Sequence, residues 1–378
     1  MKKTLLLTFI IGFVLTSCQE EQSGFEITAN IKGLSENAKV VLSETESQKI
    51  LDSAFVKNDS FKFKGYLDNT PIEISIVILP TDNNGQAKYT SIFMGNEIIE
   101  ITGLSEEFSS NLKIRGSEFN KLKIDLAEKS KPANAEYDQN FEKMISIRKD
   151  GNWNDSLQNA YWGKNGIFDN IDNQLLKIKK EFVEKNLNTH FGLRQLYRLR
   201  EDVPNEYLKS QFQKVKPDLK NTEYAKSLQI YLDSEPLKEN DAFYNFKAEN
   251  QNGEIVEFAN YFNDNRYVLL EFYSPHCGWC KMALPEIKEL AESKKDSLKV
   301  ITFNVDKDKN DWLKTNKSNN ISWESLWDEN GRYSETFVKY RVAGTPTYYL
   351  FDNKGKIVKK WTGFDKKTTV ENIKQRIK

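Results

Sequence analysis

Residues 267–281 of this 378-residue chain read YVLLEFYSPHCGWCK. The first run, Tyr267–Tyr273, is apolar at nearly every position, which predicts a buried strand. A turn and a helix over residues 278–292 follow it. Cys277 and Cys280 stand three positions apart at the start of that helix, where two thiols can form and break a disulfide without moving the fold. The same spacing could also supply half of a zinc site.

Strands and helices alternate on both sides of this stretch. A linker is expected over residues 235–240, and a hairpin around Asn252-Gly253 is expected to join strands 243–248 and 254–258. Further strands are predicted over 298–305, Thr347–Phe351 and Ile357–Thr362, and further helices over 334–340 and 367–377. Residues 237–378 are therefore predicted to form an α/β domain with a mixed sheet.

Three further features accompany the cysteine pair. Glu271 interrupts the apolar strand, Pro285 falls inside the predicted helix, and residues 344–347 read GTPT. Together with the strand and the cysteines, these motifs resemble the thioredoxin fold, specifically the membrane-anchored TlpA/ResA-like thiol-disulfide oxidoreductases. The resemblance covers about residues 240–378 and implies a thioredoxin fold with Pro346 in a cis-proline loop.

The position of the cysteines predicts how they divide the chemistry. Cys277 lies where unpaired backbone N–H groups and the helix dipole favour an anion, so its pKa should fall and a thiolate should form near neutral pH. It would attack a partner disulfide, and Cys280, further into the helix and more buried, would then attack Cys277 and release the reduced partner. Glu271 is the expected base for Cys280, since thioredoxins place a buried acid there and burial raises the pKa of a carboxyl group. The alternative for Glu271 is an ordinary surface side chain on the polar phase of the strand.

Four residues are expected to help a substrate dock. The cis bond before Pro346 would leave the backbone groups of Thr345 free to pair with an extended chain. Trp279, where this motif commonly has proline, offers a flat apolar surface and alters the redox poise. His276 either stabilises the Cys277 thiolate or is a solvent-facing loop residue.

The segments before this domain have two different patterns. Short alternating runs separated by turn residues predict a small antiparallel β-sandwich over residues 25–116, with strands over 25–29, 39–42, 60–64, 72–79, 91–94 and 98–102. From 117 to 236, apolar residues recur at helical spacing, as in Ile171/Leu175/Ile178/Phe182, and predict a helical spacer. Both segments look like the regions that precede such redox domains in some Gram-negative lipoproteins.

The N-terminus predicts export and lipidation. Lys2 and Lys3 precede an apolar run over residues 4–15 that is short for a membrane span, so residues 1–17 read as a signal peptide. The run ends in Leu-Thr-Ser before Cys18, which resembles a bacterial lipobox with Cys18 as the lipidated residue and 18–24 as a tether. The expected location is the cell envelope, with the protein facing the periplasm or the cell surface. The alternative is a plain secretory signal.

Composition and motifs limit the partners. With 55 basic and 55 acidic residues, nothing indicates binding to nucleic acid, and no Gly-rich phosphate loop indicates a nucleotide or flavin. No cofactor is therefore expected. The expected partners are protein thiol or disulfide substrates, a membrane or periplasmic electron donor, and the membrane through the lipid anchor. The family resemblance favours a reductase of exported thiols, such as those of apocytochrome c in cytochrome c maturation.

Three rival functions remain to be compared. Zinc would need four ligands, and besides the pair the chain has only His190 and His276. A peroxiredoxin shares the fold, but its P-x-x-x-T-x-x-C pattern has Leu270 and Ser274 at the matching positions here. The third is a non-enzymatic binding lipoprotein with a vestigial redox domain, against which the intact set of Glu271, both cysteines and Pro346 argues.

Overall fold

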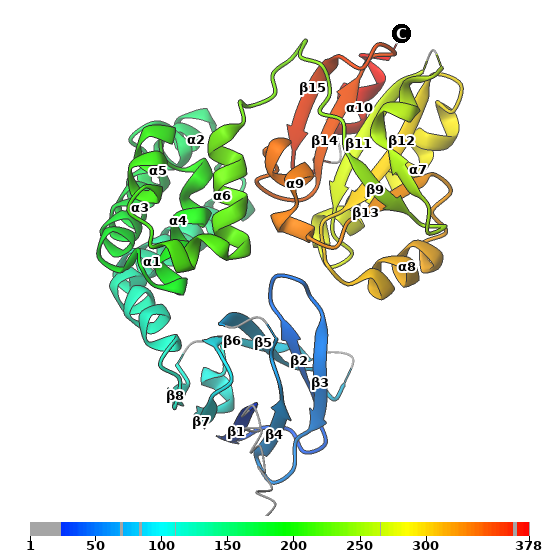
Figure 1. The fold of residues 1–378 in the computed structure, drawn as a ribbon. Helices are drawn as coiled ribbons and strands as arrows, with labels where there is room; N and C mark the ends of the chain where they lie inside the picture. The colour runs from blue at the N-terminus through cyan, green and yellow to red at the C-terminus, as the bar shows by residue number, and fades with distance from the viewer. Residues whose placement is uncertain are drawn as a thin grey trace, which may run out of the picture.

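The computed structural model describes residues 24–68, 71–82, 85–109, 111–264, 266–365 and 369–377. Figure 1 shows three parts in chain order: a β-structured part, a group of helices, and a C-terminal domain in which helices cover a sheet. This order confirms the predicted fold class. The predicted signal peptide and Cys18 lie outside the described residues. Within the described ranges, no helix is both long enough and apolar enough to cross a membrane.

Two four-stranded sheets form the N-terminal part, and their buried side chains make one hydrophobic core. The first sheet has the order β4-β1-β7-β8 and the second the order β3-β2-β5-β6. The strands are β1 (Phe25–Lys32), β2 (Lys39–Glu44), β3 (Ile50–Phe55), β4 (Ser60–Gly65), β5 (Ile72–Ile78), β6 (Lys88–Met94), β7 (Ile98–Leu104) and β8 (Lys113–Arg115). Neighbouring strands are antiparallel as predicted, except β1 and β7, which run parallel.

The sequence pattern predicts neither β3 nor β8. Both are edge strands. β3 leaves Ile50 and Phe55 exposed and shows no buried side chain, so it lacks the alternation by which a half-buried strand is recognised. β8 has only three residues, too few for a period to be visible.

The helical part runs from α1 to α6, as predicted for this region. Its helices are α1 (Asn120–Lys149), α2 (Asp155–Trp162), α3 (Ile167–Asn186), α4 (His190–Arg198), α5 (Asn205–Phe212) and α6 (Glu223–Asp233). Side chains cap three of them: Asn154, Thr189 and Thr222 each accept a backbone N–H at the start of α2, α4 and α6. Pro204 occupies the N-cap position of α5.

The C-terminal domain has a seven-stranded sheet of order β10-β9-β13-β12-β11-β14-β15. Its elements are β9 (Lys247–Asn250), β10 (Ile255–Glu257), β11 (Tyr267–Tyr273), α7 (Gly278–Ser293), β12 (Leu298–Asn304), α8 (Lys309–Ser318), β13 (Glu324–Trp327), α9 (Glu335–Lys339), β14 (Thr347–Phe351), β15 (Ile357–Thr362) and α10 (Thr369–Lys374). The predicted buried strand is confirmed: β11 is buried over most of its length and lies inside the sheet, paired with β12 in parallel and with β14 antiparallel.

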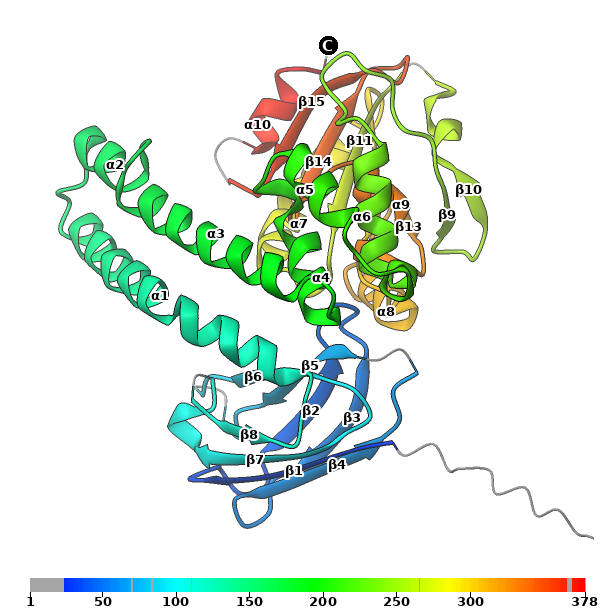
Figure 2. The ribbon, with the colours of Figure 1, turned by 60° about the vertical axis from the view of Figure 1, so that its left-hand side comes forward.

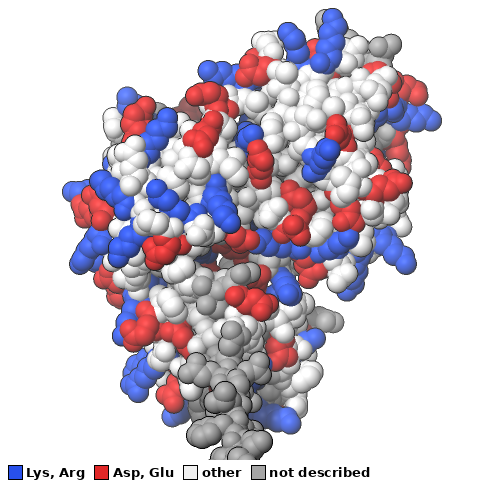
Figure 3. Space-filling view, viewed as in Figure 1, with Lys and Arg blue, Asp and Glu red and all other residues white. Residues whose placement is uncertain are grey.

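The helices pack onto the C-terminal domain through a shared core. Leu196 of α4 and Leu228 of α6 belong to the same hydrophobic cluster as Phe246, Tyr349 and Phe351 of the C-terminal domain. In Figure 1, α6 faces this domain and α5 lies on the far side of α6. In Figure 2, α1 and α3 run side by side away from the domain. Basic and acidic side chains are interspersed over the face in Figure 3, in agreement with the balanced composition.

Candidate active site

A short turn after β11 carries Cys277 to the start of α7. Ser274 organises this turn, because its carbonyl oxygen accepts the Cys277 N–H at 3.1 Å and its Oγ accepts the His276 N–H at 3.1 Å. α7 begins at Gly278, and its N-cap residue is Cys277. The N–H groups of its first turn have no partner within the helix, which makes the position of Cys277 favourable for a negative charge.

Cys277 is a partly exposed free thiol at this helix start. Its Sγ lies 3.1 Å from the Thr345 carbonyl oxygen, which accepts the thiol hydrogen. Burial raises the pKa of Cys277, but hydrogen bonds from the Thr345 side chain and from the backbone N–H groups of Cys280 and Trp279 outweigh burial. The net pKa lies below its ordinary value, so the reactive thiolate forms more readily than on an ordinary cysteine.

Cys280 is also a free thiol but is only 6% exposed. Burial raises its pKa well above the ordinary value, and the nearby Glu271 carboxylate raises it further. A thiol in this state reacts only after a neighbouring group has taken its proton.

Glu271 lies in the centre of β11, and its side chain is buried. Burial raises its pKa to about 8. Tyr348, at the facing position on β14, has a smaller effect that lowers the pKa. Glu271 and Cys280 line the same small cavity, together with Tyr273, Ser274 and others. A carboxyl group with this pKa can accept and return a proton close to neutral pH.

The loop before β14 faces Cys277. The Thr345–Pro346 peptide bond is cis, which confirms the conformation predicted for Pro346. The Pro346 carbonyl oxygen accepts the Gly363 N–H at 2.8 Å, which ties the loop to the end of β15. The Thr345 carbonyl oxygen meanwhile contacts the Cys277 thiol, so this loop and the start of α7 meet at the reactive sulfur.

His276 and Trp279 lie on either side of Cys277 in the sequence and have different surroundings. The His276 Nε2 atom lies 2.9 Å from a carboxylate oxygen of Asp311 near the start of α8. Trp279 is 57% exposed, and Met282, one turn further along α7, is exposed as well. These two side chains share one helix face and give the site an apolar rim.

Two residues of the site are not predicted from the sequence. Tyr348 lies opposite Glu271 in the β14–β11 register and lowers its pKa. The only sequence signal for Tyr348 is its position two residues after Pro346. Asp306 accepts a hydrogen bond from Ser274 Oγ, although 32 residues separate them. In the sequence Asp306 is one of several charged residues in the run DKDKND, so nothing distinguishes it there.

Comparison with known proteins shows which families these residues resemble. Residues 240–360 match a family model described as the AhpC/TSA family, and residues 25–122 match one described as a domain of unknown function, DUF4369. A thioredoxin from Pyropia yezoensis is 43% identical over 44 residues, which are 12% of this chain and 41% of that protein. A thioredoxin from Bacillus subtilis is 27% identical over 106 residues, which are 28% of this chain and 77% of that protein. This chain therefore spans less than half of the first relative.

Among solved structures, a thiol-disulfide oxidoreductase from Bacteroides fragilis is similar to this chain. The two share 26% identity, the match covers 36% of this chain and 98% of the other, and the TM-score is 0.33. The AhpC/TSA match includes Glu271, both cysteines and Pro346. Residues 240–360 match the AhpC/TSA family model and form a thioredoxin-like thiol-disulfide oxidoreductase domain.

Proposed function

We propose that the whole protein is a thiol-disulfide oxidoreductase that exchanges disulfides with exported protein substrates through Cys277 and Cys280. The observation that carries this proposal is the contrast between the two thiols. Cys277 is partly exposed with a lowered pKa, whereas Cys280 is buried with a raised pKa and shares a cavity with Glu271. One thiol is therefore suited to attack first and the other to attack second.

In the first step the Cys277 thiolate attacks one sulfur of a substrate disulfide. The substrate S–S bond breaks, a new S–S bond joins Cys277 to the substrate, and the second substrate sulfur leaves as a thiolate that takes up a proton. The backbone N–H groups of Trp279 and Cys280 hold the attacking sulfur as an anion before the step. The Thr345 side chain adds a further hydrogen bond to it.

In the second step Glu271 accepts the proton of Cys280. With a pKa of about 8, roughly one Glu271 in ten is ionised at pH 7 and able to do so. The Cys280 sulfur then attacks Cys277 Sγ, and the mixed disulfide breaks. The substrate sulfur leaves as a thiolate and takes up the proton that Glu271 accepted, so the substrate is released with two thiols. The protein has given up two electrons and holds a Cys277–Cys280 disulfide.

Substrate docking is assigned to the rim and loop around Cys277. The exposed Trp279 and Met282 would cover an apolar part of the substrate, and Thr345 next to the cis bond would pair with an extended backbone. His276 would add a polar contact beside them, since its pairing with Asp311 holds its ring near the rim.

We infer that electrons flow from this protein to its substrates, as in a reductase of the disulfides of exported proteins such as apocytochrome c. A membrane or periplasmic donor would then reduce the Cys277–Cys280 disulfide after each turnover. The reduction potential of the pair decides the direction: a value near ~−270 mV supports a reductant, and a value near ~−120 mV contradicts it in favour of an oxidant.

We infer from the N-terminal sequence that the protein is anchored in the cell envelope through a lipid on Cys18 and faces the periplasm or the cell surface. Metabolic labelling with a radioactive fatty acid tests the anchor. The wild type should be labelled and the Cys18→Ser variant should not. Equal labelling of both proteins contradicts the assignment.

The catalytic proposal is tested by reduction of insulin disulfides with dithiothreitol as electron source. The wild type should accelerate insulin precipitation, and Cys277→Ser should reduce the rate to the uncatalysed value. Equal rates for the two proteins contradict the proposal and favour a binding protein with a vestigial redox domain.

Peroxide reduction is the second candidate, because the match to the AhpC/TSA family is compatible with it. Ser274, at the position of the threonine in the peroxiredoxin pattern, donates its hydroxyl hydrogen to Asp306 rather than to an atom near the Cys277 sulfur. We therefore expect negligible consumption of hydrogen peroxide by the reduced protein. Consumption that depends on Cys277 favours the peroxidase.

A further inference from the structure

Asp306 is a buried acidic side chain beside the Cys277 turn that the proposed mechanism does not use. It follows β12, is 2% exposed, and accepts a hydrogen bond from Ser274 Oγ. Ser274 in turn accepts the N–H groups of His276 and Cys277. Asp306 thus holds the residue around which the active-site turn is built.

The position of Asp306 is itself fixed from several directions. Its backbone carbonyl oxygen accepts hydrogen bonds from Asn304 Nδ2 at 3.1 Å and from Trp327 Nε1 at 2.9 Å. Its Oδ1 atom is buried and has no hydrogen-bond partner within the described ranges. The positive charge facing that oxygen is Arg332, whose Nη2 atom lies 3.5 Å away.

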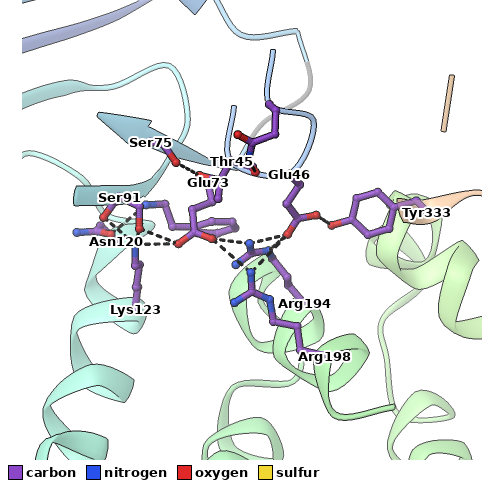
Figure 4. Close-up of polar contacts among 12 residues, drawn as sticks. Thr45, Glu46, Glu73, Ser75, Ser91, Asn120, Lys123, Arg194, Arg198 and Tyr333 are labelled. Carbon is purple, nitrogen blue, oxygen red and sulfur yellow. Dashed lines mark hydrogen bonds and ion pairs between the residues drawn. The ribbon is translucent and has the colours of Figure 1, made fainter. Parts of the chain in front are cut away.

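The other two parts of the chain hold the segment that carries Arg332. The Tyr197 hydroxyl of α4 donates to the Arg332 carbonyl oxygen at 3.0 Å, and Ser227 Oγ of α6 donates to the Tyr333 carbonyl oxygen at 2.8 Å. The Tyr333 hydroxyl donates to the carboxylate of Glu46, which lies in the turn between β2 and β3. Figure 4 shows Tyr333 reaching Glu46 across this junction.

Glu46 is anchored in the same junction by Arg194 of α4. Arg194 is 3% exposed and donates to Glu46 at 2.8 Å and to Glu73 of β5 at 2.5 Å. Lys123 of α1 pairs with Glu73 at 2.8 Å (Figure 4). The β2–β3 turn is therefore tied to α4 as well as to Tyr333, and the neighbouring strand β5 is tied to both α4 and α1.

We propose that Asp306 is a positioning residue of the Cys277 turn, and that the contact between Glu46 and Tyr333 makes the reactivity of Cys277 depend on the packing of the N-terminal part. The path runs from Glu46 through the Tyr333–Arg332 segment to Asp306, and from Asp306 through Ser274 to Cys277. The inference rests on the proposed function, because it concerns the nucleophile of that function. The N-terminal part then has a role in the reaction without contacting the sulfur.

The charges around the turn determine the direction of the effect. Asp306 faces Arg332 and is influenced by His276, which pairs with Asp311, while Glu271 lies on the Cys280 side. Loss of the bond from Ser274 releases the turn from Asp306 and leaves the Asp306 carboxylate less neutralised next to that turn. Both changes disfavour a thiolate at Cys277.

The experiment measures the rate of Cys277 alkylation by iodoacetamide against pH in the reduced full-length protein, with the modified cysteine identified by mass spectrometry. Ser274→Ala should move the profile to higher pH and slow alkylation at pH 7 about tenfold. Arg332→Gln changes a partly exposed side chain that tolerates substitution, and it should also slow the alkylation of Cys277 at pH 7. Tyr333→Phe, which removes only a hydroxyl group, should slow it about twofold to threefold. The matched control Tyr66→Phe, at an exposed tyrosine of the N-terminal part, should leave it unchanged.

Profiles equal to the wild type in Ser274→Ala and Arg332→Gln overturn the role of Asp306. If only Tyr333→Phe keeps the wild-type profile, the role of Asp306 stands, but the dependence of Cys277 reactivity on the N-terminal part is overturned. Because alkylation needs no substrate disulfide, its outcome is separate from that of the insulin assay. Failure of the wild type to reduce insulin, with the expected alkylation profiles, contradicts the proposed function alone.

Discussion

Cys277 and Cys280 are chemically identical side chains that the fold makes different. Cys277 receives hydrogen bonds at a helix start, and these outweigh the effect of its partial burial on its pKa. Cys280 has lost most of its contact with water and lies near a carboxyl group, so its pKa moves in the opposite direction. The order of the two attacks follows from this difference, with Glu271 as the group that makes the second attack feasible.

The raised pKa of Glu271 predicts a dependence of stability on pH. In the unfolded chain this carboxyl group ionises around its ordinary value of 4.5, whereas in the folded protein it stays protonated up to about pH 8. The folded state therefore binds more protons between these values, and the free energy of unfolding should fall as the pH rises through this window. The cost at pH 7 is on the order of 3 kcal/mol.

Glu271→Gln should remove this dependence. Urea unfolding at pH 5, 6, 7 and 8 measures the slope, which should be flatter in the variant than in the wild type. Equal slopes contradict the assignment of the pKa to burial of Glu271.

The same substitution tests the role of Glu271 as a base. Glu271→Gln cannot accept the proton of Cys280, so the mixed disulfide should persist and its resolution should slow by about 10²-fold or more. Rapid acid quenching and mass spectrometry measure its lifetime. An unchanged lifetime together with an unchanged attack rate contradicts the role as a base.

At the scale of single residues, the sequence predicts Glu271, both cysteines and Pro346 because each belongs to a short motif. Asp306 and Tyr348 are not predicted, because their importance comes from partners brought close by the sheet. Tyr348 faces Glu271 only through the register of β14 on β11, and Asp306 meets Ser274 only because β11 and β12 end side by side. No periodicity in the sequence encodes such a pairing.

The sequence predicts well those helices and strands whose residue types and flanking turn residues all favour the same structure. The bounds of β11, β14 and β15 agree with the prediction, since their residues are rich in β-branched and aromatic types and turn residues flank them. α8 is missed because it is largely polar and buries only Trp312 and Asn316, which is too few for a visible helical stripe. β13 is missed because it has four residues and its buried face depends on β12 and β9.

The start of α7 and the loop before β14 are in contact at Cys277, and this contact between two elements should affect the pKa of Cys277. The Thr345 side chain is a hydrogen-bond donor to the Cys277 sulfur from outside α7. Thr345→Ala should therefore raise the pKa of Cys277 and slow its alkylation at pH 7 by about threefold to tenfold. Thr345→Ser, which keeps the hydroxyl group, should restore the wild-type rate. Equal rates in the alanine and serine variants contradict this role of the hydroxyl.

At the scale of the whole molecule, charged side chains join the three parts of the chain. Burial alone raises the pKa of Glu73, but Arg194, Lys123 and Arg198 outweigh it and lower the pKa to about 2. The bonded pair Arg194 and Glu46 is separated by 148 positions in the chain. Sequence patterns report local periodicity, so this junction becomes visible only in the folded structure.

Arg194→Met should destabilise the protein strongly, because it leaves Glu46 and Glu73 without their buried partner. Breaking a buried pair in this way costs about 3–5 kcal/mol. Arg198 lies 3.5 Å from the same Glu73 carboxylate, but its side chain is half exposed, so Arg198→Met should cost no more than about 1 kcal/mol. Denaturant unfolding of the two variants provides the comparison. Equal losses of unfolding free energy contradict the view that Arg194 is the central tie of the junction.

The central claim is that Cys277 attacks the substrate and Cys280 releases it. Trapping the mixed disulfide tests this most directly, by incubating reduced Cys280→Ser and Cys277→Ser variants with a disulfide-containing peptide and analysing them by non-reducing mass spectrometry. We predict a stable adduct on Cys277 in the Cys280→Ser variant and none in the Cys277→Ser variant. An adduct on Cys280 in the Cys277→Ser variant, formed as fast as the Cys277 adduct, would contradict the account.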